Sequence, residues 1–301
     1  MAMPRRPGKR RLIRAGAALT LLAVLGYGAI SLLAADVLTR TRNRHSSFAA
    51  AQIGAGTREW STRTADGITL RGWYCPTDIH RRLIVLVHGM GGSRDNMANL
   101  ASDLRARGYD VLLFDLRGHG ESDPSRLFMG RREREDIRAV QAWATRAGYP
   151  ADRIGWLGQS MGASTLLMEA ARNEGIRVAV LDSPFGNLPE LLRDQLTRHS
   201  HLPRLFNPGI LLAARVAFGV RTDDLIPLIS ARRWGGRPML LIHGEADTIV
   251  PVAQARQIAR VAGTSCETIM LPGVPHVGAY RRDPARYVAA VGRFFDHNLK
   301  H

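Results

Sequence analysis

Short apolar runs of strand length recur through most of this chain, and they constrain its fold more than any other feature. Six runs are continuously or almost continuously apolar, which is typical of strands buried on both faces in a parallel sheet: 83–87, 111–114, 154–157, 178–181, 239–242 and 268–271. Stretches of helical composition separate most of them or follow the last: 94–107, 131–147, 161–173, 252–261 and 284–298. The alternation predicts an α/β architecture with helices on both faces of the sheet.

The start of this region differs from the rest. Residues 57–63 and 68–74 are less continuously apolar and alternate more than the six runs, and Asp66-Gly67 between them is a strong turn signal. We therefore expect the domain, 57–301, to open with an antiparallel hairpin. Together with the six apolar runs, the hairpin predicts an eight-stranded, mostly parallel sheet.

One connection is too long for a simple crossover. Nearly 60 residues separate the runs 178–181 and 239–242, where a single helix is usual. The span contains apolar helical pieces at 188–196 and 210–218, interrupted by prolines. An insertion here would lie above the carboxyl ends of the strands, where ligands bind in open α/β sheets. The sequence therefore predicts a helical lid at about 184–236, after the sixth strand.

The amino-terminal region carries a membrane signal. Residues 15–35 are 21 consecutive uncharged residues; as a helix they span ~31 Å, enough to cross a hydrocarbon core. Six basic residues precede the segment and three follow it, which places 1–14 in the cytoplasm and the rest of the chain outside it by the positive-inside rule. We expect a transmembrane anchor at 15–35 and a polar tether at 36–56.

Two other interpretations of the segment stay open. A cleaved signal peptide would end at the small residues Leu33-Ala34-Ala35 and would release the domain as a secreted protein. The apolar run is longer than the ~7–15 residues of a typical signal peptide. A buried core helix is the other alternative, and the basic flank argues against it.

Charge and cysteine content exclude several classes of protein. The net charge is +16, but residues 1–44 hold nine basic residues against one acidic residue, and so contribute half of the excess. The remainder is dispersed, without a basic run interleaved with aromatic residues, so we expect no nucleic-acid partner. Two cysteines, Cys75 and Cys266, are too few for a disulfide scaffold or a cysteine-rich zinc site.

The strongest chemical signal is the turn Gly158-Gln159-Ser160-Met161-Gly162, which joins an apolar run to a helical stretch. A G-x-S-x-G pattern alone is weak evidence. In a strand-to-helix turn it predicts a nucleophile elbow: glycines permit the tight backbone, and the serine oxygen projects above the sheet at a helix N-terminus. Ser160 is therefore the candidate nucleophile.

A serine nucleophile needs a base and an orienting acid, which follow it in the order acid, then histidine, in this topology. Asp247 and His276 each lie five residues beyond the end of an apolar run, as this arrangement requires. We assign Asp247 as the acid and His276 as the base. Glu245 and Asp182 remain alternative acids.

The oxyanion formed on attack needs backbone donors. The N–H of Met161, one residue after the serine, is one candidate. The second is the N–H of Met90, in the glycine-rich loop His88-Gly89-Met90-Gly91-Gly92-Ser93 that follows the first apolar run. His88 precedes this loop, and we interpret it as a brace rather than a base.

The remaining polar motifs do not indicate a metal or cofactor site. The loop at 114–122 is interpreted as packing beside the site, with Asp115 and Arg117 making local hydrogen bonds. His199 and His201 lack further ligands at a usable spacing for a metal. No nucleotide-binding glycine motif occurs. We expect neither a metal nor a cofactor.

Together these motifs resemble the α/β-hydrolase superfamily. The resemblance covers about residues 57–298 and rests on the His88-Gly89-x-Gly loop, the loop from Asp115 to Ser122, the Ser160 elbow, Asp247 and His276, in this order. With an anchored amino terminus and a lid, the chain looks most like the BEM46-like serine hydrolases, related to the α/β-hydrolase domain-containing 13 and 17 groups. The resemblance implies the strand order 1-2-4-3-5-6-7-8.

The same strand order has a consequence for the cysteines. It implies that Cys75, which ends strand 2, and Cys266, which enters strand 8, lie near opposite edges of the sheet. A disulfide between them is therefore not expected, even in an oxidising compartment.

We therefore expect a membrane-anchored serine esterase or lipase-like hydrolase, of the class that cleaves ester bonds. It would act on a small-molecule or lipid acyl substrate, a carboxylic ester or thioester, through an acyl-enzyme on Ser160. Two alternatives stay open: a serine peptidase of the same fold, and a catalytically silent anchored domain that binds a lipid or a protein.

Overall fold

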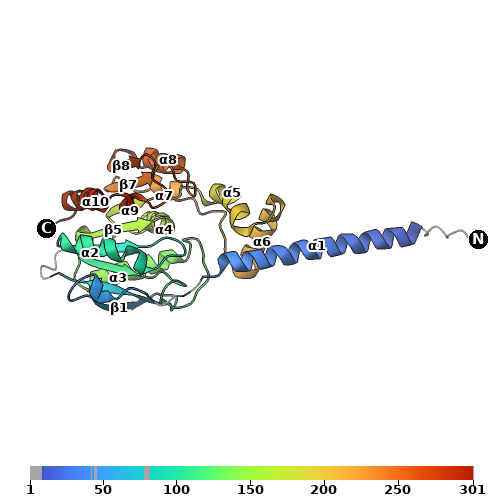
Figure 1. The fold of residues 1–301 in the computed structure, drawn as a ribbon, viewed down its shortest axis with the longest axis horizontal. Helices are drawn as coiled ribbons and strands as arrows, with labels where there is room; N and C mark the ends of the chain where they lie inside the picture. Colours follow the sequence, from blue (N-terminus) through green and yellow to red (C-terminus); the bar gives the residue numbers. More distant parts are fainter. Residues whose placement is uncertain (1–8, 42, 44–45, 78–81, 301) are drawn as a thin grey trace, which may run out of the picture. The chain divides into compact units, whose positions relative to one another are not determined.

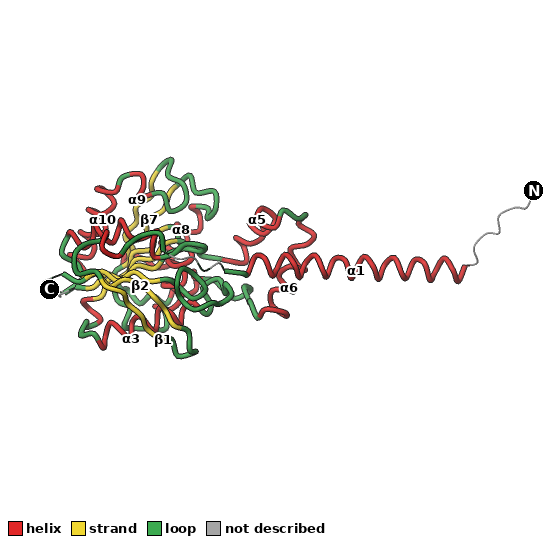
Figure 2. The backbone as a smooth tube through the Cα atoms, turned by 60° about the horizontal axis from the view of Figure 1, so that its bottom comes forward, coloured by secondary structure: helices red, strands yellow, loops and turns green. Residues whose placement is uncertain are grey.

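The computed structural model describes residues 9–41, 43, 46–77 and 82–300. In these residues, eight strands form one sheet in the order β1-β2-β4-β3-β5-β6-β7-β8. Figures 1 and 2 show strands and helices of this part of the chain. Among the strands that the structure describes, only β2 pairs antiparallel with its neighbours, β1 and β4. Both the fold class and the expected strand order are confirmed. The strands are β1 Arg58–Arg63, β2 Thr69–Cys75, β3 Leu83–Val87, β4 Asp110–Phe114, β5 Ile154–Gln159, β6 Val178–Asp182, β7 Met239–Gly244 and β8 Cys266–Leu271.

Helices cover both faces of this sheet. On one face, α2 (Ala98–Ala106) and α10 (Pro284–Asn298) share a buried core with side chains of β2, β3 and β4. Four further helices, α3 (Glu133–Arg146), α4 (Met161–Ala170), α7 (Pro227–Arg232) and α8 (Val252–Ala262), pack in sequence against one another on the other face. The short α9 (Ala279–Arg282) precedes α10. Every residue of β3 to β7 is buried, which explains why the sequences of these strands contain continuous apolar runs.

The carboxyl ends of the parallel strands meet along one edge. In register, Gln159 at the end of β5 lies beside Asp182 at the end of β6, and Asp182 lies beside Ile242 in β7. β5 and β7 run two residues beyond the apolar runs, through polar or glycine positions that an apolar pattern cannot show. The loops that leave this edge carry all of the candidate site residues.

Two compact units divide the chain. The larger comprises 40–192 and 222–301 and contains the sheet. The smaller comprises the amino-terminal residues to Thr39 together with 193–221. The end of the expected lid, from residue 222, therefore belongs to the sheet unit. Ala231 of α7 and Trp234 after it are completely or almost completely buried.

The smaller unit contains the apolar amino-terminal segment. Helix α1, Lys9–Thr39, is 31 residues long and encloses the expected span 15–35. Among the residues that the structure describes, it is the one helix long and apolar enough to cross a membrane, as an anchor or a signal sequence would be. Helix α6 (Asn207–Phe218), from the insertion, packs against it. The carboxyl end of α5 (Leu188–Ser200) belongs to the same unit.

The segment expected to be a tether, 36–56, is mostly not one. Its first residues continue α1 to Thr39. From residue 40 the chain belongs to the sheet unit, where the Asn43 amide donates to the carbonyls of Gly120 and Ser122. Ile53 is buried in the core. Isolated apolar residues such as Ile53 have no periodicity that would have revealed this packing.

The two cysteines are both free. Cys75 is buried in β2 and Cys266 begins β8, the last strand of the sheet. The expectation that they do not form a disulfide is confirmed.

Candidate active site

Ser160 occupies a sharp turn between β5 and α4. Its backbone has φ 52° and ψ −119°, a conformation that side chains rarely adopt. The flanking glycines make the turn possible: a Cβ on Gly158 would lie 2.7 Å from the backbone of Ala163, and one on Gly162 would lie 2.4 Å from the carbonyl oxygen of His88. Neither position has space for another residue, so the turn depends on both glycines.

The end of β6 supports this turn. The Ser160 N–H donates to the carbonyl oxygen of Asp182 at 2.8 Å. Ser183 and Val277, like Ser160, have a positive φ, and the Val277 N–H donates to the Ser183 hydroxyl at 3.1 Å. Non-glycine residues with positive φ thus gather where three loops meet, a concentration of strain that is common at functional sites.

A continuous hydrogen-bond chain leaves the Ser160 hydroxyl. Its Oγ lies 2.8 Å from Nε2 of His276, and Nδ1 of His276 lies 2.6 Å from Oδ2 of Asp247. A carboxylate can only accept, so Nδ1 carries the proton and Nε2 is free to accept the serine proton. The structure brings together the three residues that the sequence analysis assigned as nucleophile, base and acid.

The carboxylate of Asp247 is held on both oxygens. Oδ1 accepts from the N–H groups of Ile249 and Val250, each at 2.8 Å. Oδ2 accepts from His276 and lies 3.3 Å from Nε2 of His243. Burial raises the pKa of Asp247, but the hydrogen bonds from His243, His276 and Val250 outweigh it and hold the pKa well below its usual value. Asp247 therefore stays ionised.

The alternative acids have other partners. Glu245 forms an ion pair with Arg256 at 2.6 Å. Asp182 is fully buried, and its carboxylate accepts from the hydroxyls of Ser183 (2.9 Å) and Tyr287 (3.0 Å). The carboxylate that accepts from His276 is that of Asp247.

Sequence reasoning missed His243. This residue is fully buried in β7, and its Nε2 lies 2.9 Å from the carbonyl oxygen of Val250 as well as close to Asp247. Nε2–H is therefore a donor shared between two oxygens that flank the acid loop. Nothing in the sequence distinguishes His243 from a solvated residue after an apolar run, because its role depends on the fold of the loop that follows.

The glycine-rich loop after β3 lies directly against the serine. A Cβ on Gly89 would lie 3.1 Å from Cβ of Ser160. The Gly92 N–H closes a turn on the Gly89 carbonyl at 3.2 Å, and the Gly91 N–H donates to Nε2 of His119 at 3.2 Å. Met90 is the residue inside this turn, and its side chain is half exposed.

The second expected oxyanion donor, Met161, is the first residue of α4. The N–H groups of a first helical turn have no acceptor within the helix. They also lie at the positive end of the helix dipole. This position suits a negative charge formed on a group attached to Ser160.

His88 joins two loops, as the sequence analysis interpreted it. Its Nδ1–H donates to the Gly89 carbonyl at 2.7 Å, and its Nε2 accepts from the Leu116 N–H at 3.0 Å. Complete burial, with a smaller contribution from His119, lowers the pKa of His88 to about 3. A neutral, buried imidazole with both nitrogens occupied is a structural brace and not a base.

The expected local hydrogen bonds of Asp115 and Arg117 are confirmed. Oδ1 of Asp115 accepts from the Arg94 N–H at 2.7 Å. Arg117 forms hydrogen-bonded ion pairs with Asp66 and with the buried Asp136. These contacts fix the loop that carries His119 and Leu116, which in turn hold the loop after β3.

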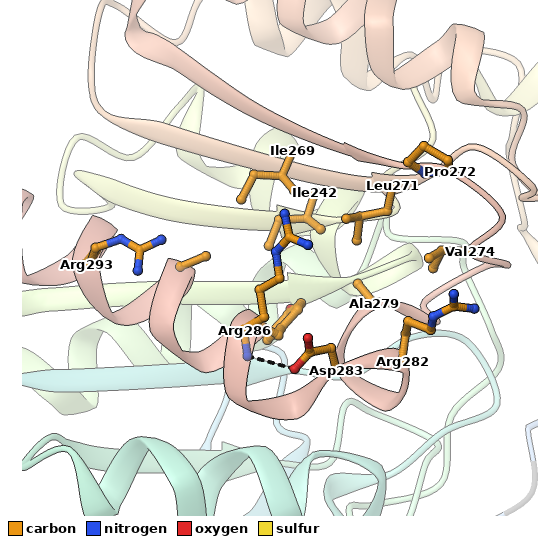
Figure 3. A pocket seen from close by; sticks show the side chains of 12 residues that line it. Ile242, Ile269, Leu271, Pro272, Val274, Ala279, Arg282, Asp283, Arg286 and Arg293 are labelled. Atoms are coloured by element: carbon orange, nitrogen blue, oxygen red, sulfur yellow. Dashed lines mark hydrogen bonds between the residues drawn. The ribbon is translucent and has the colours of Figure 1, made fainter.

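A hollow of about 390 Å³ lies elsewhere, between β8 and the α9–α10 segment (Figure 3). Apolar residues such as Ile269 and Leu271 form part of its lining, with three arginines also lining it. Ser160, Asp247 and His276 do not line it. Tyr287 does, and its hydroxyl donates to the buried Asp182. The hollow therefore lies behind the candidate site and is not the space above the serine.

Comparison with known proteins agrees with this architecture. A family profile described as alpha/beta hydrolase fold matches residues 82–208. The chain has the alpha/beta hydrolase fold. The esterase Pf2001 of Pyrococcus furiosus superposes with a TM-score of 0.72 at 23% identity, over 87% of this chain and 100% of that one. A structure described as a membrane phospholipase A gives a TM-score of 0.60 at 19% identity, over 96% and 99%.

Two sequence relatives are 29% and 28% identical to this chain. The uncharacterized protein Rv2307c of Mycobacterium tuberculosis is 29% identical over 79% of this chain and 78% of its own length. The lysophosphatidylserine lipase ABHD12 of Danio rerio is 28% identical over 61% of this chain and 48% of its own length.

Proposed function

We propose that this chain is a membrane-anchored serine hydrolase that cleaves carboxylic esters through an acyl-enzyme on Ser160. The observation that carries the proposal is the hydrogen-bond chain from the Ser160 hydroxyl through His276 to Asp247. Its tautomer and its ionised acid are those that nucleophilic catalysis needs. The esterase and lipase names among similar proteins support an ester substrate.

In this mechanism the Ser160 oxygen attacks the carbonyl carbon while Nε2 of His276 takes its proton. Asp247 holds the imidazole in position and stabilises its cationic form. The N–H groups of Met90 and Met161 donate to the carbonyl oxygen as it becomes an oxyanion. His276 then protonates the leaving alcohol, and water, activated by the same histidine, hydrolyses the acyl-enzyme.

The membrane location and a lipid-derived acyl ester are part of the same proposal. Helix α1 has the length and apolarity of an anchor, and the charge asymmetry around it favours a catalytic domain outside the cytoplasm. The similarity to a membrane phospholipase A and a lysophosphatidylserine lipase favours a lipid substrate. The finer resemblance to the BEM46-like hydrolases belongs to this proposal as well.

The test is hydrolysis of p-nitrophenyl esters with acyl chains from C2 to C16 by the full chain in detergent, beside Ser160→Ala. A fluorophosphonate probe, which labels an activated serine, is applied to both proteins. We expect turnover and labelling that both disappear in the variant. Equal turnover by the variant would refute the mechanism. Labelling without ester turnover would point instead to a peptide or another acyl substrate.

A further inference from the structure

The amino-terminal helix and part of the insertion form one unit, although about 150 residues separate them in sequence. The ring of Tyr27 in α1 stacks on Phe206, with centroids 5.0 Å apart and an interplanar angle of 16°. The Tyr27 hydroxyl donates to the Leu205 carbonyl at 2.9 Å and accepts from the Gly209 N–H at 3.1 Å. The side chain of Tyr27 thus contacts residues just before α6 and residues in its first turn.

The contact continues along α1 through small residues. A Cβ on Gly209 would lie 2.4 Å from Oγ of Ser31, so the two backbones approach too closely for a larger side chain. Ser31 is 2% exposed, and Ile210 and Ala214 of α6 are also buried. Close approach through glycine and serine is typical of helix pairs within membranes.

These contacts fall inside the apolar stretch of α1. Tyr27 and Ser31 both lie within 15–35, and Tyr27 is eight residues, about 12 Å of helix, from Ala35 at its carboxyl end. If 15–35 crosses a bilayer, residues that touch Tyr27 lie within the lipid and not above it. The beginning of α6 is therefore at the depth of the membrane half that adjoins the domain.

The opposite side of α6 is apolar and exposed. Leu205, Leu212 and Val216 are 63%, 63% and 76% exposed. A spacing of four residues places Leu212 and Val216 on one face of α6, and Leu205 lies in the short 3-10 helix Arg204–Phe206 that leads into it. Surface helices normally direct such a stripe at a core, but here the buried Ile210 and Ala214 lie on the other side.

We propose that α6 and its flanking residues 204–206 lie in the membrane together with α1, with the stripe Leu205, Leu212 and Val216 facing lipid acyl chains. The inference rests on the membrane anchor of the proposed function. The partner of this surface is the bilayer itself. The middle part of the insertion between β6 and β7 is then bound in the membrane.

The charges of the segment suit this location. Residues 193–221 contain five arginines and one aspartate. Long basic side chains can keep their charge at the headgroups while their stems lie along apolar surface. Anionic headgroups would strengthen such binding. The charge bias therefore predicts a preference for anionic lipid in addition to the apolar contact.

The test places a fluorophore on α6 of the full chain. In a Cys266→Ser background, which leaves the buried Cys75, single cysteines are introduced as Leu212→Cys and Val216→Cys and labelled with an environment-sensitive dye. Leu25→Cys in α1 and Ala142→Cys on the exposed side of α3 are the matched controls. Each protein is reconstituted in phosphatidylcholine vesicles, with and without phosphatidylglycerol, that carry acyl-chain nitroxide quenchers.

We expect blue-shifted emission and strong quenching at 25, 212 and 216, and neither at 142. Quenching at 25 with water-like emission at 212 and 216 would overturn the proposal while leaving the anchor intact. Water-like emission at all four positions would overturn the anchor as well. The readout uses no turnover, so it is independent of whether Ser160 acts on esters.

A second variant examines the consequence for substrate access. Leu212→Ser combined with Val216→Ser keeps the contacts of α6 with α1 but removes most of the stripe. We expect unchanged labelling by a soluble fluorophosphonate and about tenfold or greater loss of activity on an ester embedded in vesicles, since two large apolar side chains no longer bury in lipid. Equal losses on soluble and embedded esters would contradict a membrane role for the stripe.

Discussion

Replacing Asp247 by asparagine tests the proposed chemistry most directly. In the structure Oδ1 accepts two backbone N–H groups, from Ile249 and Val250, and Oδ2 accepts from His276. An asparagine has one acceptor oxygen, and the two N–H groups fix it at the Oδ1 position. Its NH₂ group must then face Nδ1 of His276.

This orientation reverses the tautomer of the histidine. Nδ1 becomes the acceptor and the ring proton moves to Nε2, which can no longer take the proton of Ser160. We expect kcat to fall by ~10⁴, which corresponds to ~5.5 kcal/mol of transition-state stabilisation. The free energy of unfolding should change little, because the two backbone hydrogen bonds persist and His243, which loses Oδ2 as an acceptor, keeps the Val250 carbonyl.

The assay is p-nitrophenyl ester hydrolysis by the full chain, with urea unfolding of each variant. Glu245→Gln is the matched control, because Glu245 contacts Arg256 and not His276; its kcat should stay within about twofold of the unsubstituted chain. Combining Asp247→Asn with Ser160→Ala should cost no more than Ser160→Ala alone, since residues of one catalytic unit are non-additive. A less than tenfold fall in kcat for Asp247→Asn would refute the assignment of the acid.

Three further outcomes are expected. Gly162→Ala places a Cβ 2.5 Å from the Val87 carbonyl oxygen, so the variant should unfold at a clearly lower urea midpoint and lose fluorophosphonate labelling; normal labelling would contradict the tight elbow. Because burial lowers the pKa of His88 from 6.5 to about 3, the unfolded chain binds the proton more readily, so this residue's contribution is complete above pH 6.5 and is lost as the pH falls towards 3. Urea titrations should lose about 2 kcal/mol of stability from this group between pH 7 and pH 5, and His88→Gln should remove that part of the slope; an unchanged slope would disprove the buried neutral imidazole. Tyr287→Phe removes the donor to the fully buried Asp182 carboxylate and should lower the free energy of unfolding by about 2 kcal/mol, whereas no change by urea titration would mean that the carboxylate is satisfied without it.

Local patterns predicted the sheet and the reactive turn well. Fully buried strands such as β3 appear as uninterrupted apolar runs, and 83–87 matches the structure at both ends. The elbow at Ser160 was predictable because its glycines meet a local steric requirement. Asp247 and His276 could be assigned because each lies in the loop that follows an apolar run, although β7 itself ends at Gly244 and β8 at Leu271.

Long-range packing was not predictable in this way. His243 belongs to a strand and becomes significant only when the loop to Val250 folds back beside Asp247. The contact of Tyr27 with Phe206 joins segments that no periodicity connects. Ile53 is one apolar residue in a polar stretch, and its burial depends on the core that the other elements create.

The position of Asp182 has a consequence for how this site tolerates change. Its carbonyl positions the serine turn, and its carboxylate accepts from Ser183, whose hydroxyl in turn holds the histidine loop at Val277. Nucleophile and base are 116 residues apart in sequence, yet they are aligned through two consecutive residues at one strand end. Residues 193–221 belong to the other unit and contribute none of these hydrogen bonds. Their length and composition can therefore change without altering the alignment, so substrate preference can diverge while the reaction geometry is inherited intact.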